Sequence, residues 1–254
     1  RRWEEFTDED LHEDLRIQRT KHYLVLSNAG GSLFAKKMEE FYDDIQKVYP
    51  FEEVRGRRLM PVFVFRTKDQ YVKYYARVAE IPESEAERSK GHAWRDYYAT
   101  YYESPNDPVH IHEATHQVFF NRLGLHGGGS WFQEGVAEYM SANGNEVRSV
   151  VRGRIKSDDA TPFRSLMVVP SLLQSLRGGS IRGGSAAGNA YTEAASIIAF
   201  VRESRFGKAK FQEFIRAVGQ APESDLEAID AALQEVYQVG IDEFEEEWKR
   251  YWAR

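Results

Sequence analysis

Apolar residues follow strand and helix spacing along the chain, and they divide it into a mixed first half and a helical second half. Residues 22–28 and 60–65 contain short apolar runs rich in β-branched and aromatic side chains, which predict buried strands. Apolar positions recur at helical spacing over residues 32–48 and 67–78. The aromatic segment 91–102 that follows predicts one strand or a hairpin.

Residue types that favour helix ends mark the borders of these segments. Ser32 is a candidate cap for the first helix, and Pro50 stops it because proline has no amide hydrogen to donate. Thr67 and Gln70 have the spacing of a capping box at the start of the second helix. The polar and acidic residues 80–90 predict a surface loop.

The second half begins with a helix whose two ends are both marked. Asn106 or Asp107 can cap its start, and Pro108 suits its first position. Gly124 ends it directly after Leu123.

A second capping-box pattern, at Ser130 and Gln133, predicts the start of a helix over residues 131–142. Residues 177–188 are rich in Gly and Ser and predict a flexible loop, which is a candidate flap over the active-site cleft. Apolar periodicity predicts further helices at about 164–177, 190–205, 208–218, 224–238 and 241–253.

These elements predict an α+β fold in a single domain over residues 1–254, with a mixed subdomain at 1–123 and a mainly helical one at 124–254. The 42% hydrophobic and 29% charged content is typical of a globular protein, and the net charge of -6 gives no basic surface for nucleic acid. No apolar run is long enough to predict a membrane span. The absence of cysteine excludes disulfides, a thiol nucleophile and a Cys-ligated metal.

The strongest chemical pattern is an H-E-x-x-H motif formed by His112, Glu113 and His116. Residues four apart share one helical face, so both imidazoles can reach one ion at about 2.0–2.1 Å. Glu113 is turned away from that face and can act as a general base toward a metal-bound water. The helix start at 106–108 lies outside the motif and meets its requirement for a helix. The alternative is a surface helix with two exposed histidines.

A catalytic zinc needs a third protein ligand and an open position. Glu134 and Glu138 lie four apart on one face of the following predicted helix, in W-F-Q-E-G-V-A-E-Y. Glu134 is the candidate third ligand, and Glu138 can accept a hydrogen bond from the far nitrogen of a ligating histidine. A solvated acidic face is the alternative, but apolar residues surround both carboxylates.

The two motifs, separated by seventeen residues between His116 and Glu134, resemble those of the gluzincin metallopeptidases, which include thermolysin and the aminopeptidase N family. The resemblance implies one zinc ion on His112, His116 and Glu134, with Glu138 as a supporting carboxylate. The segment from Tyr191 resembles the aminopeptidase helix that begins with an oxyanion-stabilising tyrosine, although the family's Lys-Gly is missing. The alternative is a tyrosine that packs on the core.

Most of residues 20–253 also resemble a bacterial family of uncharacterised peptidase-MA-like domains. This implies a zincin-like fold with an edge strand beside the zinc helix, and an exported or envelope location, with a cytoplasmic one as the alternative. In gluzincins the edge strand binds substrate backbone, which makes Gly91, His92, Ala93 and Trp94 candidates; an ordinary strand with core aromatics is the alternative. The G-x-M-E-N motif of the large aminopeptidases is absent.

Three other histidines are not assigned to the metal. His110 precedes the motif by two residues and points away from the metal face. His92 and His126 lie outside the motif and are interpreted as core or surface residues rather than proton donors.

The sequence therefore predicts a zinc-dependent hydrolase that cleaves a peptide or protein substrate. Glu113 acts as the base, and zinc and Tyr191 stabilise the oxyanion. An inactive zinc-containing binding or scaffold domain of the same fold is the main alternative, and a helical protein with a chance motif is a third. Because the chain starts at Arg1 without Met, we expect that it is trimmed, so that any signal peptide would be missing from this sequence. The oligomeric state and the natural substrate have no signature in the sequence.

Overall fold

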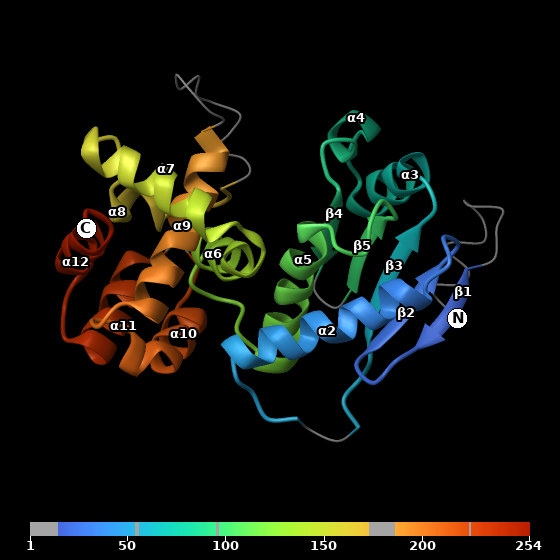
Figure 1. Ribbon diagram of the computed structural model, residues 1–254, viewed down its shortest axis with the longest axis horizontal. Helices are drawn as coiled ribbons and strands as arrows, with labels where there is room; N and C mark the ends of the chain where they lie inside the picture. Colours follow the sequence, from blue (N-terminus) through green and yellow to red (C-terminus); the bar gives the residue numbers. More distant parts are fainter. Residues whose placement is uncertain (1–14, 54–55, 95–96, 173–185, 224) are drawn as a thin grey trace. The chain divides into compact units, whose positions relative to one another are not determined.

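The computed structural model (Figure 1) describes the chain except for residues 1–14, 54–55, 95–96, 173–185 and 224. Its fold is α+β, and it divides into two compact units between Gly124 and Leu125. The first unit contains a mixed sheet with helices, and the described part of the second unit is helical.

A five-stranded sheet of order β1-β2-β3-β5-β4 organises the first unit. The central strands β2, β3 and β5 run parallel, and β1 and β4 pair antiparallel at the two ends of this order. The predicted aromatic segment is thus a hairpin of β4 and β5. The strands are β1 (Arg16–Arg19), β2 (Tyr23–Ser27), β3 (Met60–Phe65), β4 (Gly91–Trp94) and β5 (Tyr97–Tyr101).

Helices cover both faces of this sheet. Side chains alternate between the two faces along each strand, so neighbouring residues of a strand pack against different helices. Phe63 and Phe65 pack with α3 on one face. Val62 pairs with Tyr98, whose hydroxyl contacts His110 of α5, so these residues lie on the opposite face. The helices of this unit are α2 (Ser32–Val48), α3 (Lys68–Ala79), α4 (Glu83–Ala86) and α5 (Pro108–Val118), which continues into the π-helical turn η1 (Phe119–Leu123).

The predicted helix ends of the first unit are partly confirmed. Thr67 caps α3 and accepts a hydrogen bond from the Gln70 amide, and Gly124 ends η1 with a positive φ of 67°. Ser32 is not a cap: it is the first residue of α2, and Gly31 precedes it without a side-chain hydrogen bond. The predicted loop at 80–90 contains the short helix α4.

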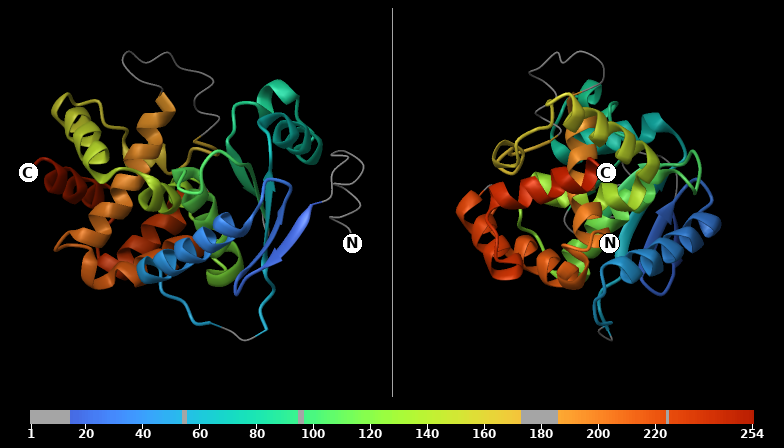
Figure 2. Two further views of the ribbon diagram at one scale, coloured as in Figure 1. Left: turned by 45° about the vertical axis from the view of Figure 1, so that its right-hand side comes forward. Right: turned by 60° about the vertical axis from the view of Figure 1, so that its left-hand side comes forward.

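The second unit is formed by helices, with α6 and α9 in extensive contact (Figure 2). Further contacts join α7 to α9, α10 to α11, and α12 to α7, α8, α9 and α11. The helices are α6 (Ser130–Ser141), α7 (Gly144–Lys156), α8 (Phe163–Leu166), α9 (Ala186–Glu203), the 3-10 turn η3 (Lys208–Lys210), α10 (Phe211–Gln220), α11 (Leu226–Tyr237) and α12 (Ile241–Trp252).

Two predictions for the second unit are wrong, and one of its helices was not predicted. The capping box at Ser130 and Gln133 does not form, because the Ser130 hydroxyl accepts the amide of Leu172 and the Gln133 side chain donates to Gly127. Helix α7 was not predicted. In place of a helix over 164–177, α8 ends at Leu166.

The predicted loop at 177–188 falls mainly outside the described residues, and its last three residues begin α9. The flap therefore stays a prediction. None of the helices in the described ranges is long and apolar enough to cross a membrane.

Candidate metal centre

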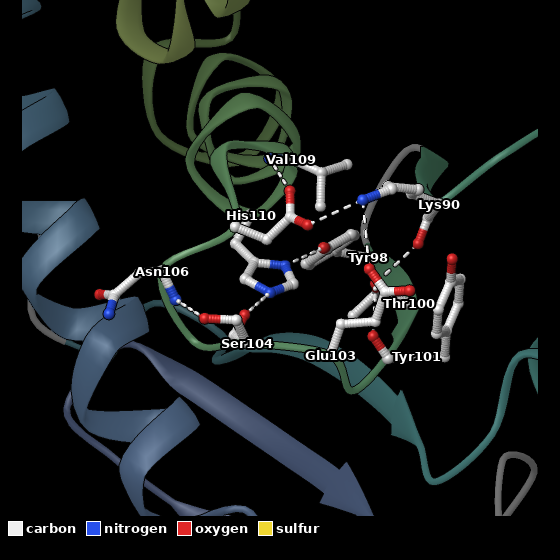
Figure 3. Close-up of polar contacts among 10 residues, drawn as sticks. Lys90, Tyr98, Thr100, Tyr101, Glu103, Ser104, Asn106, Val109 and His110 are labelled. Atoms are coloured by element: carbon white, nitrogen blue, oxygen red, sulfur yellow. Dashed lines mark hydrogen bonds and ion pairs between the residues drawn. The ribbon is translucent and has the colours of Figure 1, made fainter.

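The start of α5 is fixed by polar contacts that set the direction of the H-E-x-x-H helix. The Asp107 carboxylate accepts the amide of Val109 at 3.0 Å and is therefore the cap, while Asn106 lies before it. Lys90, directly before β4, pairs with Asp107 and with Glu103, each at 3.1 Å (Figure 3). Partial burial opposes ionisation of Asp107, but the Val109 and Lys90 hydrogen bonds hold its pKa below the ordinary value.

His110 anchors α5 to the sheet and is not available to a metal. It is buried, and burial lowers its pKa, which favours the neutral ring. Its Nε2 lies 2.8 Å from the Ser104 carbonyl oxygen, which can only accept, so Nε2 donates there. Nδ1 is then the acceptor for the Tyr98 hydroxyl at 2.7 Å (Figure 3). Both ring nitrogens are thus engaged.

His112 and His116 direct a nitrogen each toward one point beside α5. Both rings are half-buried, and their Nε2 atoms are 3.2 Å apart. Two nitrogens bound tetrahedrally to one zinc at about 2.0–2.1 Å are separated by roughly 3.3 Å. The pair therefore has the spacing of two ligands of one tetrahedral ion.

Glu134 completes a group that can hold a metal. It lies on α6, in the second unit, and is half-buried. One ligand atom from each of His112, His116 and Glu134 lies within 4.8 Å of the others, which makes these three the candidate ligands among the described residues. Two imidazoles and one carboxylate form a donor set that suits zinc and leaves a fourth position open.

The sequence around Glu134 is explained by the packing of α6 on α9. A Cβ atom on Gly135 would lie 3.0 Å from the carbonyl oxygen of Ala194, so glycine permits the close approach of the two helices. Tyr191 is three residues before Ala194 and hence on the same side of α9. Within the second unit, Glu134 and Tyr191 therefore lie on contacting helices, and both are half-buried.

Glu138 lies one turn after Glu134 on α6. Its carboxylate accepts the Ser141 hydroxyl at 3.3 Å, within the last turn of the helix. The side chain is half-buried, so it is neither a core residue nor a fully solvated one.

Glu113 is buried on α5, with 9% of its surface exposed, among tyrosines of the first unit. Burial is the main cause of the raised pKa of Tyr71, Tyr75 and Tyr98, and the negative charge of Glu113 raises all three further. These tyrosines come from α3 and β5. Sequence reasoning missed them, because only the fold brings them near the motif.

The candidate substrate strand 91–94 is β4, at one end of the described sheet. The His92 ring is buried, stacks on Tyr75 at 3.9 Å, and has Nδ1 3.2 Å from the Tyr71 hydroxyl. Burial lowers the pKa of His92 to about 3. Gly91 is needed because a Cβ there would lie 2.9 Å from the Tyr98 ring. His92 is therefore a core residue by its side chain.

The remaining predicted histidine, His126, is exposed in the segment before α6. Ala93 of β4 is half-buried, and the structure describes the backbone of Trp94 as the last residue of that strand.

Comparison of the sequence with known protein families and curated proteins found no match.

Proposed function

We propose that the protein is a zinc-dependent hydrolase that cleaves peptide bonds, with His112, His116 and Glu134 as the ligands of one zinc ion. The observation that carries this proposal is the ligand geometry. The two Nε2 atoms are 3.2 Å apart, and a carboxylate oxygen of Glu134 lies within 4.8 Å of the histidine ligand atoms. The likeness of both motifs to those of the gluzincins supports it, and the proposal includes a zincin-like arrangement within the α+β fold.

The donor set favours zinc over harder cations. Magnesium and calcium prefer ligand sets made only of oxygen, whereas imidazole suits zinc and other late transition metals. Two histidines, one carboxylate and an open position are the pattern of catalytic rather than structural zinc. When bound, zinc lowers the pKa of a coordinated water toward about 7 and polarises the scissile carbonyl.

The residues around the ligands have distinct parts in this proposal. Glu113 accepts a proton from the attacking water and passes it to the leaving amine. Tyr191 donates its phenol hydrogen to the developing oxyanion. Glu138 positions a ligand histidine by accepting its second ring N–H.

Substrate backbone pairs with β4 in this proposal. A strand at a sheet end has amide and carbonyl groups free for an added strand, and main-chain pairing is indifferent to side-chain identity. Because the His92 ring is buried, the backbone of His92 rather than its side chain takes this part. The substrate is then an extended peptide or an unfolded segment of a protein, and an exported location agrees with the resemblance.

Replacement of Glu113 tests the proposal. Glu113→Gln keeps the shape of the side chain but removes the proton acceptor. We expect it to retain zinc and to lose turnover of a diverse peptide mixture by at least about 10²-fold, measured by mass spectrometry. The control is His126→Gln, which alters an exposed histidine outside the motif and should cleave as the wild type does.

Equal cleavage by Glu113→Gln and wild type would contradict the proposed base. Zinc-loaded wild type that cleaves none of the peptides would instead favour the alternative of a non-catalytic zinc domain.

A further inference from the structure

A cavity of about 330 Å³ lies within the second unit, among α6, α7, α9 and α12. Small alanine side chains on α9 and directly after α6 leave this space, and the largely buried indole of Trp252 forms part of its wall. The alanines are Ala142, Ala195 and Ala199. Its volume lies at the lower end of the range of small-molecule sites, which are mostly apolar with a few placed polar groups.

Arg148 supplies the positive charge of this cavity. It lies on α7, is exposed, and holds its guanidinium 5.7 Å from the centre of the Trp252 ring. Within the described part of the chain no carboxylate forms an ion pair with Arg148. Its hydrogen-bond donors are therefore open to a ligand, in a planar arrangement that matches a carboxylate.

Asn143 adds a further donor at the edge of the cavity. Its side-chain oxygen accepts the amide of Asn145 at 3.0 Å and caps α7. The side-chain NH₂ of Asn143 is then the group that remains for a ligand oxygen.

One carboxylate, that of Glu203, also lines the cavity, and each of its oxygens already accepts one hydrogen bond. The donors are the hydroxyls of Tyr139 at 3.2 Å and of Tyr251 at 3.4 Å, which partly neutralise its charge. The guanidinium of Arg148 accepts no hydrogen bond and has no carboxylate partner among the described residues, so the cavity favours an anionic ligand over an ammonium group.

We propose that this cavity binds a carboxylate that carries an apolar group, with the carboxylate on Arg148 and the apolar group against Trp252 and the alanines. Two sources share this chemistry: the C-terminal residue of a peptide and a short-chain fatty acid. The inference stands independently of the proposed zinc chemistry, because no metal ligand lines the cavity.

Binding can be tested on the full chain after dialysis against a chelator, which removes carboxylate binding to zinc. The probes are N-acetylphenylalanine, hexanoate, and N-acetylphenylalaninamide as the uncharged control. The indole N–H signal of Trp252, assigned by its loss in Trp252→Phe, reports on the cavity wall. We expect both acids or one of them to shift this signal saturably at millimolar concentration, and the amide to leave it unchanged.

Matched variants test whether the guanidinium of Arg148 binds the carboxylate of the ligand. Arg148→Gln should weaken binding of the acid by about tenfold or more, since a charge-assisted pair is lost. Arg205→Gln, which alters an exposed arginine outside the cavity, should leave affinity unchanged. Glu203→Gln should leave or raise the affinity for an acid, whereas a site for ammonium groups would lose affinity. Ala199→Leu, which fills the cavity, should abolish binding while the circular dichroism stays that of the wild type.

A shift by N-acetylphenylalanine alone would assign the site to peptide C-termini, and a shift by hexanoate alone would assign it to acyl chains; either supports the proposal. It is overturned if neither acid shifts the signal at 10 mM, roughly the weakest affinity worth assigning. It is also overturned if the amide binds equally well, or if Arg148→Gln binds as tightly as wild type.

Discussion

Tyr191 lies on the side of α9 that contacts α6, one turn from the Gly135–Ala194 contact. If its phenol stabilises an oxyanion, Tyr191→Phe should lower kcat by about 10–10³-fold and leave zinc content and KM nearly unchanged. Steady-state kinetics on a peptide substrate measure this. Tyr139→Phe is the control, because that hydroxyl donates to Glu203 on the surface. Equal kinetics for Tyr191→Phe and wild type would leave Tyr191 a packing residue.

His92 links the stability of the first unit to pH. Its folded-state pKa of about 3 lies below the ordinary histidine value of about 6.5. Between these values the unfolded chain binds a proton that the folded chain does not. The neutral His92 ring therefore makes its full contribution to the free energy of unfolding above pH 6.5. This contribution falls by about 1.4 kcal/mol per pH unit as the pH decreases toward 3.

Denaturant unfolding at pH 7 and pH 5 measures this dependence. We expect wild type to lose about 2 kcal/mol more than His92→Gln over that interval. His126→Gln should keep the wild-type dependence, because that ring is exposed. The same loss in His92→Gln and wild type would show that other groups carry the pH dependence.

Among the elements, the contact of α6 with α9 is the one most sensitive to a single methyl group. Gly135→Ala would place a Cβ 3.0 Å from the Ala194 carbonyl oxygen and 3.3 Å from Ile198 Cγ1. We expect a loss of about 1–3 kcal/mol of unfolding free energy, because backbone atoms must move apart. Gly153→Ala, in α7, is a matched control with open space around it, and should gain about 0.5–1 kcal/mol. Thermal unfolding should therefore show a lower melting temperature for Gly135→Ala and a higher one for Gly153→Ala. A Gly135→Ala variant that is more stable than wild type would contradict the close helix contact.

Elements with their own chemical signals could be predicted from sequence, and the others could not. Thr67 and Asp107 cap α3 and α5 with their side chains, and both starts were predicted. Helix α7 has little apolar content and buries only Val147 and Val151 among its described residues, so its pattern is weak. Strand β1, with the sequence RIQR, is largely exposed and has no apolar alternation.

Two features of the sequence led to wrong predictions. The segment after α8 continues with apolar residues, but Pro170 cannot take part in a helix interior, and α8 ends at Leu166. Glycine before α2 and α6 replaced the expected side-chain caps, since Gly31 and Gly129 precede these helices without a capping hydrogen bond.

The candidate ligands could be predicted because the spacing of His112 and His116 within one helix fixes their geometry locally. Their surroundings could not. The tyrosines whose pKa the charge of Glu113 raises come from α3 and β5. The burial of His92 depends on the packing of Tyr75 upon it. Such contacts join residues distant in sequence, and no local pattern encodes them.

For the whole molecule, the proposed ion has a consequence for unfolding. His112 and His116 belong to the first unit and Glu134 to the second, so a shared ion would stabilise both units together. At a zinc concentration 100 times Kd, we expect about 2.7 kcal/mol of added stability. Thermal unfolding should show one transition at higher temperature with zinc, and a lower one or two separate transitions with chelator. Unfolding that is indifferent to zinc would contradict a specific site.

Zinc content after dialysis is the most direct measurement of the central claim. The account predicts about one zinc per wild-type chain, and a similar content in Glu113→Gln and His126→Gln. His112→Ala, His116→Ala and Glu134→Ala should each lose most of the bound metal under the same dialysis, while circular dichroism shows that the chain remains folded. Full zinc content in Glu134→Ala would remove Glu134 from the ligand set, and a metal-free wild type in zinc-containing buffer would contradict the site altogether.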